Sequence, residues 1–464
     1  MAPMSTLFLA RLQFAFTISF HYIYPPMSIG LGLILVIMEG LYLRTNNPLY
    51  HQMTRFWVRI FGLIFAIGVA TGVVMEFEFG TNWAAYSRYV GDVFGSALAS
   101  EGIFAFFLES GFLAILLFGW DKVPRGLHFL STVLVAFGAH FSAVWITVAN
   151  SWMQTPSGYH IVADGLKARA EITDFWAMVF NPSSIDRLLH VFAAAWSTGA
   201  WLVISVSSYY LLKKRHTDFA KASLKIGLLV AFVATVGNIV TGDMSAKGVA
   251  RNQPEKLAAM EGVFEPNAPA DVHMMGWVFA DEERVAGMKA PIPGLLSWLV
   301  SGSRQTPVKG LKAFPKDERP PVNPVFQAYH GMVAVGMLLF ALTLIGLFLW
   351  WRGTLFSERR LLWIFVFAVL GPQIGNQLGW ITAEVGRQPW IVYRLLRTSE
   401  ALSKTVQAGA VLSSLAMFTF IYALLFAVFI YLLDSKIRQG PEEDDLIPSK
   451  GPTCMSDLLK GHRA

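Results

Sequence analysis

Nine long apolar segments constrain the fold of this chain more than any other feature. Each can cross the ~30 Å hydrocarbon core of a bilayer, which takes about 20 helical residues. Unpaired backbone groups are not tolerated in lipid, so such segments are expected to be helical. The segments are Phe14–Leu43, Phe56–Met75, Gly95–Trp120, Leu127–Trp152, Asp186–Leu212, Ala222–Thr241, Val325–Trp351, Leu361–Ala383 and Ala410–Leu433. The sequence predicts an all-α polytopic membrane protein, with a kink at Pro25-Pro26 and no strands.

Composition supports this class and excludes several others. Only 15% of the residues are charged, whereas a soluble protein has roughly 25%. The net charge of +6 requires no nucleic-acid partner, because basic loops facing the cytoplasm account for it. The single cysteine, Cys454, excludes an internal disulfide, a thiolate cluster and a CxxCH haem attachment. Any metal must therefore use His, Met or carboxylate ligands. No cleavable signal precedes the first segment, which is expected to be a true span.

Basic residues predict the orientation of the spans. Lys and Arg concentrate after the first, third, fifth and seventh segments and at the C-terminus. The positive-inside rule places these parts in the cytoplasm and the N-terminus outside. The expected organisation is spans in 1–242, one long extracytoplasmic loop in 243–324, further spans in 325–433 and a cytoplasmic polar tail in 434–464. A loop of this length is usually functional or disordered.

The stretch Gly379–Trp390, GWITAEVGRQPW, places a carboxylate at the end of an apolar segment. Such a group costs free energy unless it is bound to something. Glu384 could bind a metal, take part in a proton relay or pair with Arg387. A plain interfacial ion pair flanked by Trp380 and Trp390 explains the stretch equally well.

Four further polar or sulfur-bearing side chains are expected in one layer of the membrane. At ~1.5 Å per helical residue, His21, Glu101, His190 and Met332 lie roughly 6–11 Å below the outer boundary, and Glu384 lies nearby. Taken singly, a histidine is often a hydrogen-bonded packing residue and a methionine a core filler. Together, imidazole, thioether and carboxylate groups without cysteine match the axial ligands of haem iron.

A second carboxylate is expected to share a channel with Glu101. Glu109 follows eight residues later, which is about 80° around a helix, so both can face one interior path. A mid-membrane carboxylate is a proton-relay candidate, which Ser142 and Asn150 could extend. A protonated, hydrogen-bonded glutamic acid is the alternative, as is pairing of Glu101 with Arg11.

Two other histidines receive different expectations. No role is assigned to His140, which lies in the middle of a span. His330 stands two residues before Met332, so their side chains point apart on a helix. We therefore expect His330 to be a boundary residue rather than a metal ligand.

With these residues in view, the chain resembles subunit I of the cytochrome bd-type quinol oxidases over almost its whole length. GRQPW in an outward loop is close to diagnostic of that family, and the nine spans also fit. The stretches that carry the resemblance, in family order, are RLQFAFTISFHYIYPP, GVATGVVMEFEFGTNW, EGIFAFFLES, LLHVFAAAWSTGA, PEKLAAME, HGMVAVGM and AEVGRQPW.

The resemblance implies a set of haem ligands. His190 and Met332 match the axial ligands of a low-spin haem b. His21 and Glu384 match the ligands of two high-spin haems, a haem b and a haem d or a further haem b in its place. Which of these haems each residue holds stays open.

The resemblance also implies roles around the haems and along the proton path. Glu101 matches the carboxylate beside the oxygen-reactive haem, and Glu109 matches the proton path from the cytoplasm. Arg387 and Trp380 match groups near the haems, where an arginine would neutralise propionates. His330 stands where other members have arginine, so a charge near the low-spin haem would depend on pH.

The long loop matches the quinol-binding Q-loop of the family, in its short form. Lys256 and Glu261 match the quinol-site residues. Five residues apart is about 140° on a helix, so the two are not expected to be neighbours there. Short-loop members include cyanide-insensitive oxidases, some of them without a clear haem d signal.

The function implied is that of a terminal oxidase subunit in the bacterial cytoplasmic membrane. Quinol is oxidised at the outer face, with Glu261 a candidate proton acceptor, and O₂ is reduced to water with protons from the cytoplasm. A second integral-membrane subunit is implied, and a small single-span chain could be a third. Two alternatives remain: a cytochrome b anchor passing electrons between quinone and a dehydrogenase, and a haem-free proton-coupled transporter, in which Met332 would have no role.

Overall fold

The computed structural model describes residues 5–163, 165–265 and 268–446. Within these residues nine helical stretches are long and apolar enough to cross a membrane, which confirms the nine predicted spans. They are Thr6–Thr45, Pro48–Thr81, Gly91–Phe118, Arg125–Gln154, Ser184–Lys213, Thr217–Asn252, Val322–Trp351, Arg359–Val385 and Ala408–Gln439. Cys454 and the tail from residue 447 lie outside the described residues.

Several spans consist of more than one helix. The α-helices are α1 (Thr6–His21), α2 (Tyr24–Thr45), α3 (Pro48–Thr81), α4 (Ala84–Tyr89), α5 (Gly91–Ser100), α6 (Phe107–Phe118), α7 (Arg125–Gln154), α8 (Phe175–Val179), α9 (Ser184–Lys213), α10 (Thr217–Asn252), α11 (Pro254–Glu261), α12 (Leu295–Ser301), α13 (Val322–Trp351), α14 (Arg359–Ala368), α15 (Leu370–Val385) and α16 (Ala408–Gln439). A π-helix, Glu101–Phe106, joins α5 to α6. Helices α1 and α2 form the first span, and α14 and α15 the eighth.

The break between α1 and α2 places a functional candidate at a helix end inside a span. Helix α1 ends at His21, and α2 begins at Tyr24 with a proline in its first turn. Proline is tolerated there because a first-turn residue has no intrahelical N–H partner to lose. The first span begins at Thr6, earlier than predicted, so His21 lies deeper along it than the sequence indicated.

Two expectations about the connecting segments are wrong. The described residues contain strands, in three two-stranded antiparallel sheets. The strands are β1 (Tyr159–Val162), β2 (Arg169–Ile172), β3 (His273–Phe279), β4 (Arg284–Lys289), β5 (Trp390–Val392) and β6 (Leu396–Arg397). Apolar residues occupy both exposed and buried positions of β3, HMMGWVF, so its sequence lacks the alternation that announces a strand. Helix α10 also continues to Asn252, so the predicted loop begins about ten residues later than 243.

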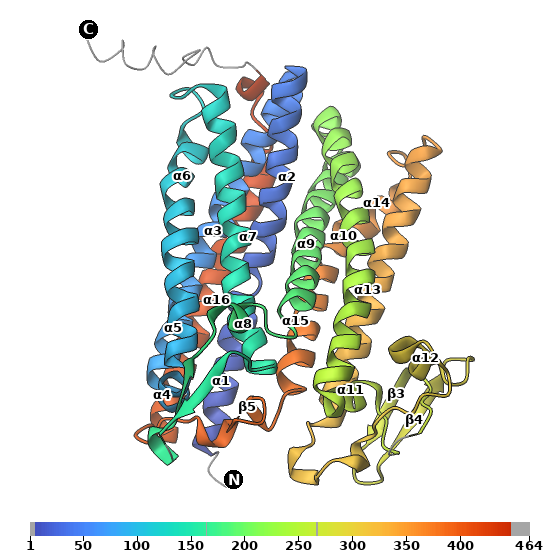
Figure 1. Cartoon of the computed structure of the whole chain (residues 1–464). Helices are drawn as coiled ribbons and strands as arrows, with labels where there is room; N and C mark the ends of the chain where they lie inside the picture. Colours follow the sequence, from blue (N-terminus) through green and yellow to red (C-terminus); the bar gives the residue numbers. More distant parts are fainter. Residues whose placement is uncertain (1–4, 164, 266–267, 447–464) are drawn as a thin grey trace.

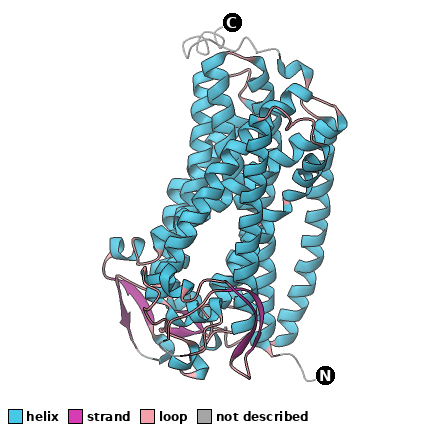
Figure 2. Ribbon diagram, turned by 90° about the vertical axis from the view of Figure 1, so that its right-hand side faces the viewer, coloured by secondary structure: helices cyan, strands magenta, loops and turns pink. Residues whose placement is uncertain are grey.

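The two ends of the bundle differ. All the strands, with α11 and α12, gather at the end where α1 begins, here called the N-terminal end (Figures 1 and 2). Helix α16 finishes at the opposite, C-terminal end. There Asp445 forms ion pairs with Arg55 and Arg59 of α3, both at 2.9 Å. Which end faces the cytoplasm stays a prediction from the basic residues.

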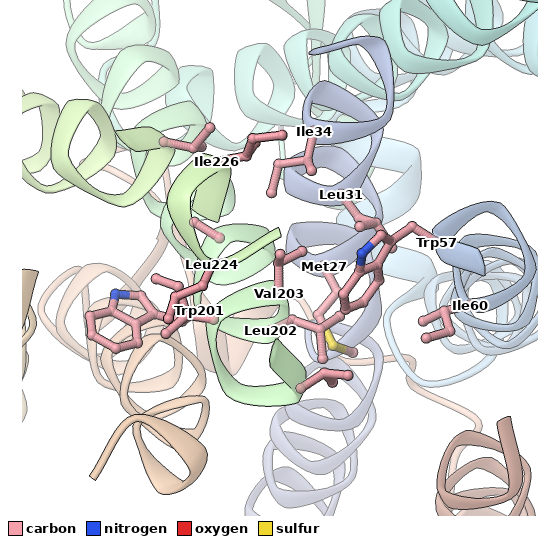
Figure 3. Close-up of a cluster of buried hydrophobic side chains, with 14 of the residues drawn as sticks. Met27, Leu31, Ile34, Trp57, Ile60, Trp201, Leu202, Val203, Leu224 and Ile226 are labelled. Atoms are coloured by element: carbon pink, nitrogen blue, oxygen red, sulfur yellow. The ribbon is translucent and has the colours of Figure 1, made fainter. Parts of the chain in front are cut away.

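The largest cluster of buried hydrophobic side chains lies in the half of the bundle nearer the C-terminal end, and smaller clusters around Trp152 and Phe326 pack the N-terminal end beside the cavity. Side chains of α2, α3, α9 and α10 interlock in the largest cluster, among them Trp57, Trp201 and Leu224 (Figure 3). Gly30 of α2 and Gly199 of α9 allow their helices to touch, because a Cβ on Gly199 would lie 2.7 Å from Gly30 Cα. The opposite halves of α3, α9 and α10 line a cavity instead.

A buried ion pair joins α2 to α7. His128 Nδ1 lies 2.7 Å from Glu39 Oε1, and both side chains are 2% exposed. His128 Nε2 lies 3.2 Å from the carbonyl oxygen of Leu116, and Thr132 donates to Glu39 Oε2 at 2.5 Å. Both ring nitrogens face oxygen acceptors, so hydrogen bonding is complete only when the ring is doubly protonated and cationic.

Removing one member of this pair should destabilise the protein strongly. Glu39→Gln leaves a buried cation without its counter-charge, which costs about 3–5 kcal/mol. The Glu39→Leu/His128→Phe double variant removes both charges and should lose less. Thermal unfolding of the purified protein measures both variants. A single variant as stable as the wild type would show that the pair is not charged.

Candidate functional site

A cavity of about 1470 Å³ occupies the N-terminal half of the bundle. Its wall is built from the ends of the spans that the core leaves unfilled, together with α11 and α12. All ten site residues predicted from the sequence line this cavity: His21, Glu101, Glu109, His190, Lys256, Glu261, Met332, Trp380, Glu384 and Arg387. The ten residues therefore lie around one cavity, and the role of each stays a prediction.

His21 is held by a neighbouring helix through one ring nitrogen. Its Nδ1 lies 3.0 Å from Thr71 Oγ1 on α3. The Thr71 hydroxyl donates its own proton to carbonyl oxygens of α3, to Ile67 and Gly68 at 3.0 Å. Thr71 therefore accepts from Nδ1–H, which leaves the lone pair on Nε2 free to bind a metal. Gly72 makes room for the ring, since a Cβ there would lie 3.2 Å from His21 Cε1.

His190 has the same arrangement on another pair of helices. Its Nδ1 lies 3.0 Å from Thr241 Oγ1 on α10, and Thr241 donates to the carbonyl oxygen of Gly237 at 2.7 Å. Gly242 faces the ring, as Gly72 does at His21. Two Thr–Gly pairs thus fix two histidines as the same tautomer, each with Nε2 available.

His140 and His330 use both of their ring nitrogens. His140 contacts the carbonyl oxygen of Ala136 at 2.7 Å and accepts from Trp196 Nε1 at 2.9 Å. His330 contacts the carbonyl oxygens of Phe326 and His273 at 2.9 and 2.6 Å. His140 is thus a packing residue, and His330 a boundary residue joining α13 to β3. Neither imidazole ring can bind a metal through one of its nitrogens without losing a hydrogen bond.

Met332 projects from α13 toward α15. A Cβ on Gly379 would lie 3.0 Å from Met332 Sδ, so glycine is required for the sulfur to sit there. Trp380 follows on α15, with its ring 6.1 Å from that of Tyr22. A thioether sulfur on a cavity wall is a suitable axial ligand for haem iron, as the sequence indicated.

Glu384 accepts hydrogen bonds from two residues of α7 and from Arg387, which follows the end of α15. Its Oε1 accepts from Asn150 Nδ2 at 3.0 Å and from Gln154 Nε2 at 3.3 Å. Its Oε2 accepts from Arg387 Nη2 at 2.5 Å, so the ion pair considered from the sequence is formed. A carboxylate oxygen has two lone pairs, which leaves one acceptor position on Oε2 for a metal.

Positive charge exceeds negative charge around this network. The guanidinium groups of Arg187 and Arg387 lie near the single carboxylate of Glu384, and Arg187 also donates to Asn150. Arg387 Nη1 is buried without a hydrogen-bond partner among the described residues. Buried cations in excess require an anion nearby. Haem propionates meet that requirement, so the cavity, its free ligand atoms and its charge fit haem groups.

Two carboxylates line the cavity from the span of α5 and α6. Glu101 begins the π-helix and accepts from Ser142 Oγ at 2.5 Å; no ion pair with Arg11 is present among the described residues. π-Helical turns are frequent at functional sites. Glu109 lies against Gly138, and its side chain is buried. Ser142 therefore extends this pair as predicted, whereas Asn150 belongs to the Glu384 network.

Lys256 lies in the first turn of α11 and Glu261 at its end, and their side chains have different partners. Lys256 Nζ donates to Gln154 Oε1 at 2.5 Å and to Gln253 Oε1 at 2.8 Å. Burial, together with Arg187, holds the pKa of Lys256 well below its usual range. Glu261 instead hydrogen-bonds Tyr329 of α13, and burial raises its pKa to about 7. The two are thus in separate environments, as the helical spacing predicted.

Four residues of the site escaped the sequence analysis: Arg187 and Tyr329, which line the cavity, and Thr71 and Thr241, which hydrogen-bond its two histidines. Thr–Gly pairs occur at 71–72, 198–199 and 241–242, and Thr198 bonds Ala194 and Asn376 instead of a histidine, so this pattern alone does not identify the site. Arg187 stands three residues before His190 and was read as part of the span end.

Comparisons with known proteins identify the family of this chain. A family model described as cytochrome bd terminal oxidase subunit I matches residues 9–441. The cytochrome bd ubiquinol oxidase subunit 1 of Bacillus subtilis is 39% identical, over 95% of this chain and 96% of its own. The cytochrome bd-II ubiquinol oxidase subunit 1 of Escherichia coli is 37% identical, over 93% and 96%. The structure of bd oxidase from Geobacillus thermodenitrificans superposes with a TM-score of 0.86 at 28% identity, over 95% of this chain and all of that one. The chain therefore belongs to the cytochrome bd terminal oxidase subunit I family.

Proposed function

We propose that this chain is the haem-binding subunit of a terminal quinol oxidase in the bacterial cytoplasmic membrane. It oxidises quinol and reduces O₂ to water, and it works with a second subunit. The curated relatives are named as ubiquinol oxidase subunits, which supports this reaction over an electron-transfer anchor or a haem-free transporter. A small third chain is a further proposal from family resemblance.

One observation carries the proposal most directly. Two histidines present a free Nε2 to the same cavity, each fixed through Nδ1 by a threonine, while both ring nitrogens of His140 and of His330 are hydrogen-bonded. A proton relay in a transporter would not need a threonine that hydrogen-bonds each histidine and fixes the tautomer that binds a metal.

The haem ligands follow from this geometry and from the resemblance. His190 and Met332 would hold a low-spin haem b, and His21 and Glu384 two high-spin haems, of which one is haem d or a further haem b. Bound haem would supply the one-electron steps between quinol and O₂. The cations Arg187 and Arg387 would bind haem propionates.

Glu261 is suited to accept a proton from quinol. Oxidation of quinol to quinone releases two electrons and two protons. The Glu261 side chain is buried and lines the cavity, and its Oε2 has no hydrogen-bond partner among the described residues. Tyr329 of α13 faces its side chain, and His273 Nδ1 of β3 lies 3.2 Å from its backbone oxygen. Lys256, drawn toward Gln154, would instead stabilise anions near Glu384.

The proton route to oxygen would run from the C-terminal end through Glu109 to Glu101. Reduction of one O₂ to two waters consumes four electrons and four protons. Glu101 is fixed by Ser142 on the cavity wall, and Glu109 lies on the same wall. With the C-terminal end in the cytoplasm, protons are released outside and consumed from inside, so charge is separated without a pump.

The low-spin ligands can be tested by absorption spectroscopy. His190→Ala or Met332→Ala removes one axial ligand, so the low-spin haem spectrum should disappear while the high-spin bands remain. Met417→Ala, at an exposed methionine of α16, serves as the control and should leave every band unchanged. Retention of the low-spin spectrum in both ligand variants would refute the assignment.

Glu109 can be tested through oxygen consumption. Glu109→Gln keeps the side-chain shape but cannot release a proton, so turnover should fall by about 10²-fold or more with all haems present. Glu282→Gln, in an exposed turn, is the matched control. Wild-type turnover in the Glu109 variant would show that no essential proton passes through this residue.

The proposed role of Glu261 as proton acceptor predicts that the rate of quinol oxidation depends on pH. The base must be ionised to accept a proton, and its pKa is about 7. The kcat/KM for quinol should therefore rise as pH increases through about 7 and level off above it. Glu261→Gln should abolish this rise, whereas Glu265→Gln, at an exposed position four residues on, should keep it. An unchanged pH profile in Glu261→Gln would exclude this residue as the acceptor.

A further inference from the structure

We propose that the outward face of the β3–β4 hairpin binds a soft monovalent cation, Cu(I), through three methionines. The ligands are the thioether sulfurs of Met274 and Met275 on β3 and of Met288 on β4, with the indole ring of Trp277 beside them. These four residues are here called the methionine patch. None of the four lines the cavity, so the site is separate from the haem and quinol chemistry and does not rest on the proposed function.

One face of the hairpin is fixed to the bundle. Val278 is 3% exposed and belongs to a buried cluster with side chains of α11 and α13. Gln327 of α13 donates to the backbone oxygen of Gly276 at 2.8 Å. Successive side chains of a strand point to opposite faces, so Trp277 points away from the bundle and is 57% exposed. The hairpin thus presents its other face outward, at the edge of the N-terminal end beside α11 and α12 (Figure 1).

A β-bulge gathers the three methionines. His273 of β3 pairs with Lys289 of β4. The next pair along is Met275 with Met288, which leaves Met274 as an extra residue in β3. A bulge places two residues of one strand opposite a single residue of the other. Met274 and Met275 are adjacent, yet both are exposed, at 53% and 62%, and Met288 is 50% exposed. The bulge therefore puts two thioethers of β3 on the same face as the thioether of β4.

The spacing allows the four side chains to reach one ion. Met275 and Met288 are directly opposite each other, a position in which Cβ atoms are about 4.5–5.5 Å apart. Methionine is unbranched and flexible, so both sulfurs can turn toward an ion between them. Trp277 pairs with Ala286, two residues from Met288, and such diagonal neighbours are within reach of aromatic side chains. Thioether sulfur and the face of an indole ring both attract a soft cation.

The ligand set selects a soft metal. Thioethers bind Cu(I), whereas Zn(II) and Ca(II) prefer imidazole, thiolate or oxygen ligands. His273, next to Met274 in the chain, faces the bundle, with its Nδ1 3.2 Å from the backbone oxygen of Glu261. Lys289, next to Met288, pairs with Asp271 at 3.1 Å. These neighbours add no oxygen or imidazole ligand, so the patch should prefer Cu(I) to Zn(II).

Contact with lipid does not explain the same surface. The turn of the hairpin follows Phe279 closely and carries four consecutive charged residues, 281–284. Charges of this density are costly inside hydrocarbon. On the outward face, Arg284 Cζ lies 4.5 Å from the centre of the Phe279 ring and covers it. No arginine or lysine covers Trp277 in this way among the described residues, so its ring is open to a bound cation.

Competition for Cu(I) tests the site directly. The complex with its second subunit, in a Cys454→Ser background that removes the thiol of this chain, is titrated without oxygen against Cu(I) held by the coloured chelator bicinchoninate. Loss of colour measures the Cu(I) that the protein takes up. The intact patch should bind one ion more per complex than the Met275→Leu/Met288→Leu variant, and excess Zn(II) should not displace it. Met417→Leu, at an exposed methionine of α16, is the matched control and should leave uptake unchanged.

Equal uptake of Cu(I) by the intact patch and by the double variant would overturn the site, as would displacement by Zn(II). An unchanged haem spectrum shows that the variant has folded. If it has not, X-ray absorption of copper bound to the intact complex decides, because sulfur neighbours support the site and nitrogen or oxygen neighbours overturn it. Trp277→Leu keeps all three sulfurs and should weaken binding several-fold; unchanged affinity would remove the ring from the site.

Discussion

Hydrogen bonds between helices decide which polar side chains in this bundle remain available for chemistry. In an apolar interior every polar atom needs a partner, so an atom left free marks a position for a ligand. Thr71 and Thr241 each occupy one nitrogen of a histidine and leave the other toward the cavity. By the same rule, Arg387 Nη1, which has no hydrogen-bond partner within the described part of the chain, marks a position for a ligand beside Glu384. Both ring nitrogens are hydrogen-bonded in His128, His140 and His330, so these residues belong to the scaffold.

The division of the bundle into a packed half and an open half follows from the same helices. Within α3, α9 and α10 one half of each helix carries core residues and the other half lines the cavity. The close approach of α2 and α9 at Gly30 and Gly199 fixes the helices at the packed end. The open end can therefore hold large groups without losing the helix arrangement. The strands and α11 and α12 close that end, which places Lys256 and Glu261 on the cavity wall.

The sequence predicted the spans and the cavity residues because both depend on strong local signals. Apolar length alone identified all nine spans, and polar side chains inside apolar segments identified His21, His190 and Glu109. The hairpins escaped because β3 has apolar residues on both faces. The end of α10 escaped because the helix continues after its apolar stretch stops. Arg187, Thr71 and Thr241 act through contacts between helices, which one sequence without a structure does not reveal.

The central claim is that the cavity holds haem groups, at least one of which is open to a gas. It is tested most directly by the dithionite-reduced minus oxidised absorption spectrum of the protein purified with its second subunit, repeated after addition of carbon monoxide. The account predicts haem bands with a component that carbon monoxide shifts, and a chlorin band in the red would identify haem d. Haem bands without any carbon monoxide response would contradict an oxidase, and a spectrum without haem would contradict the whole assignment of the cavity.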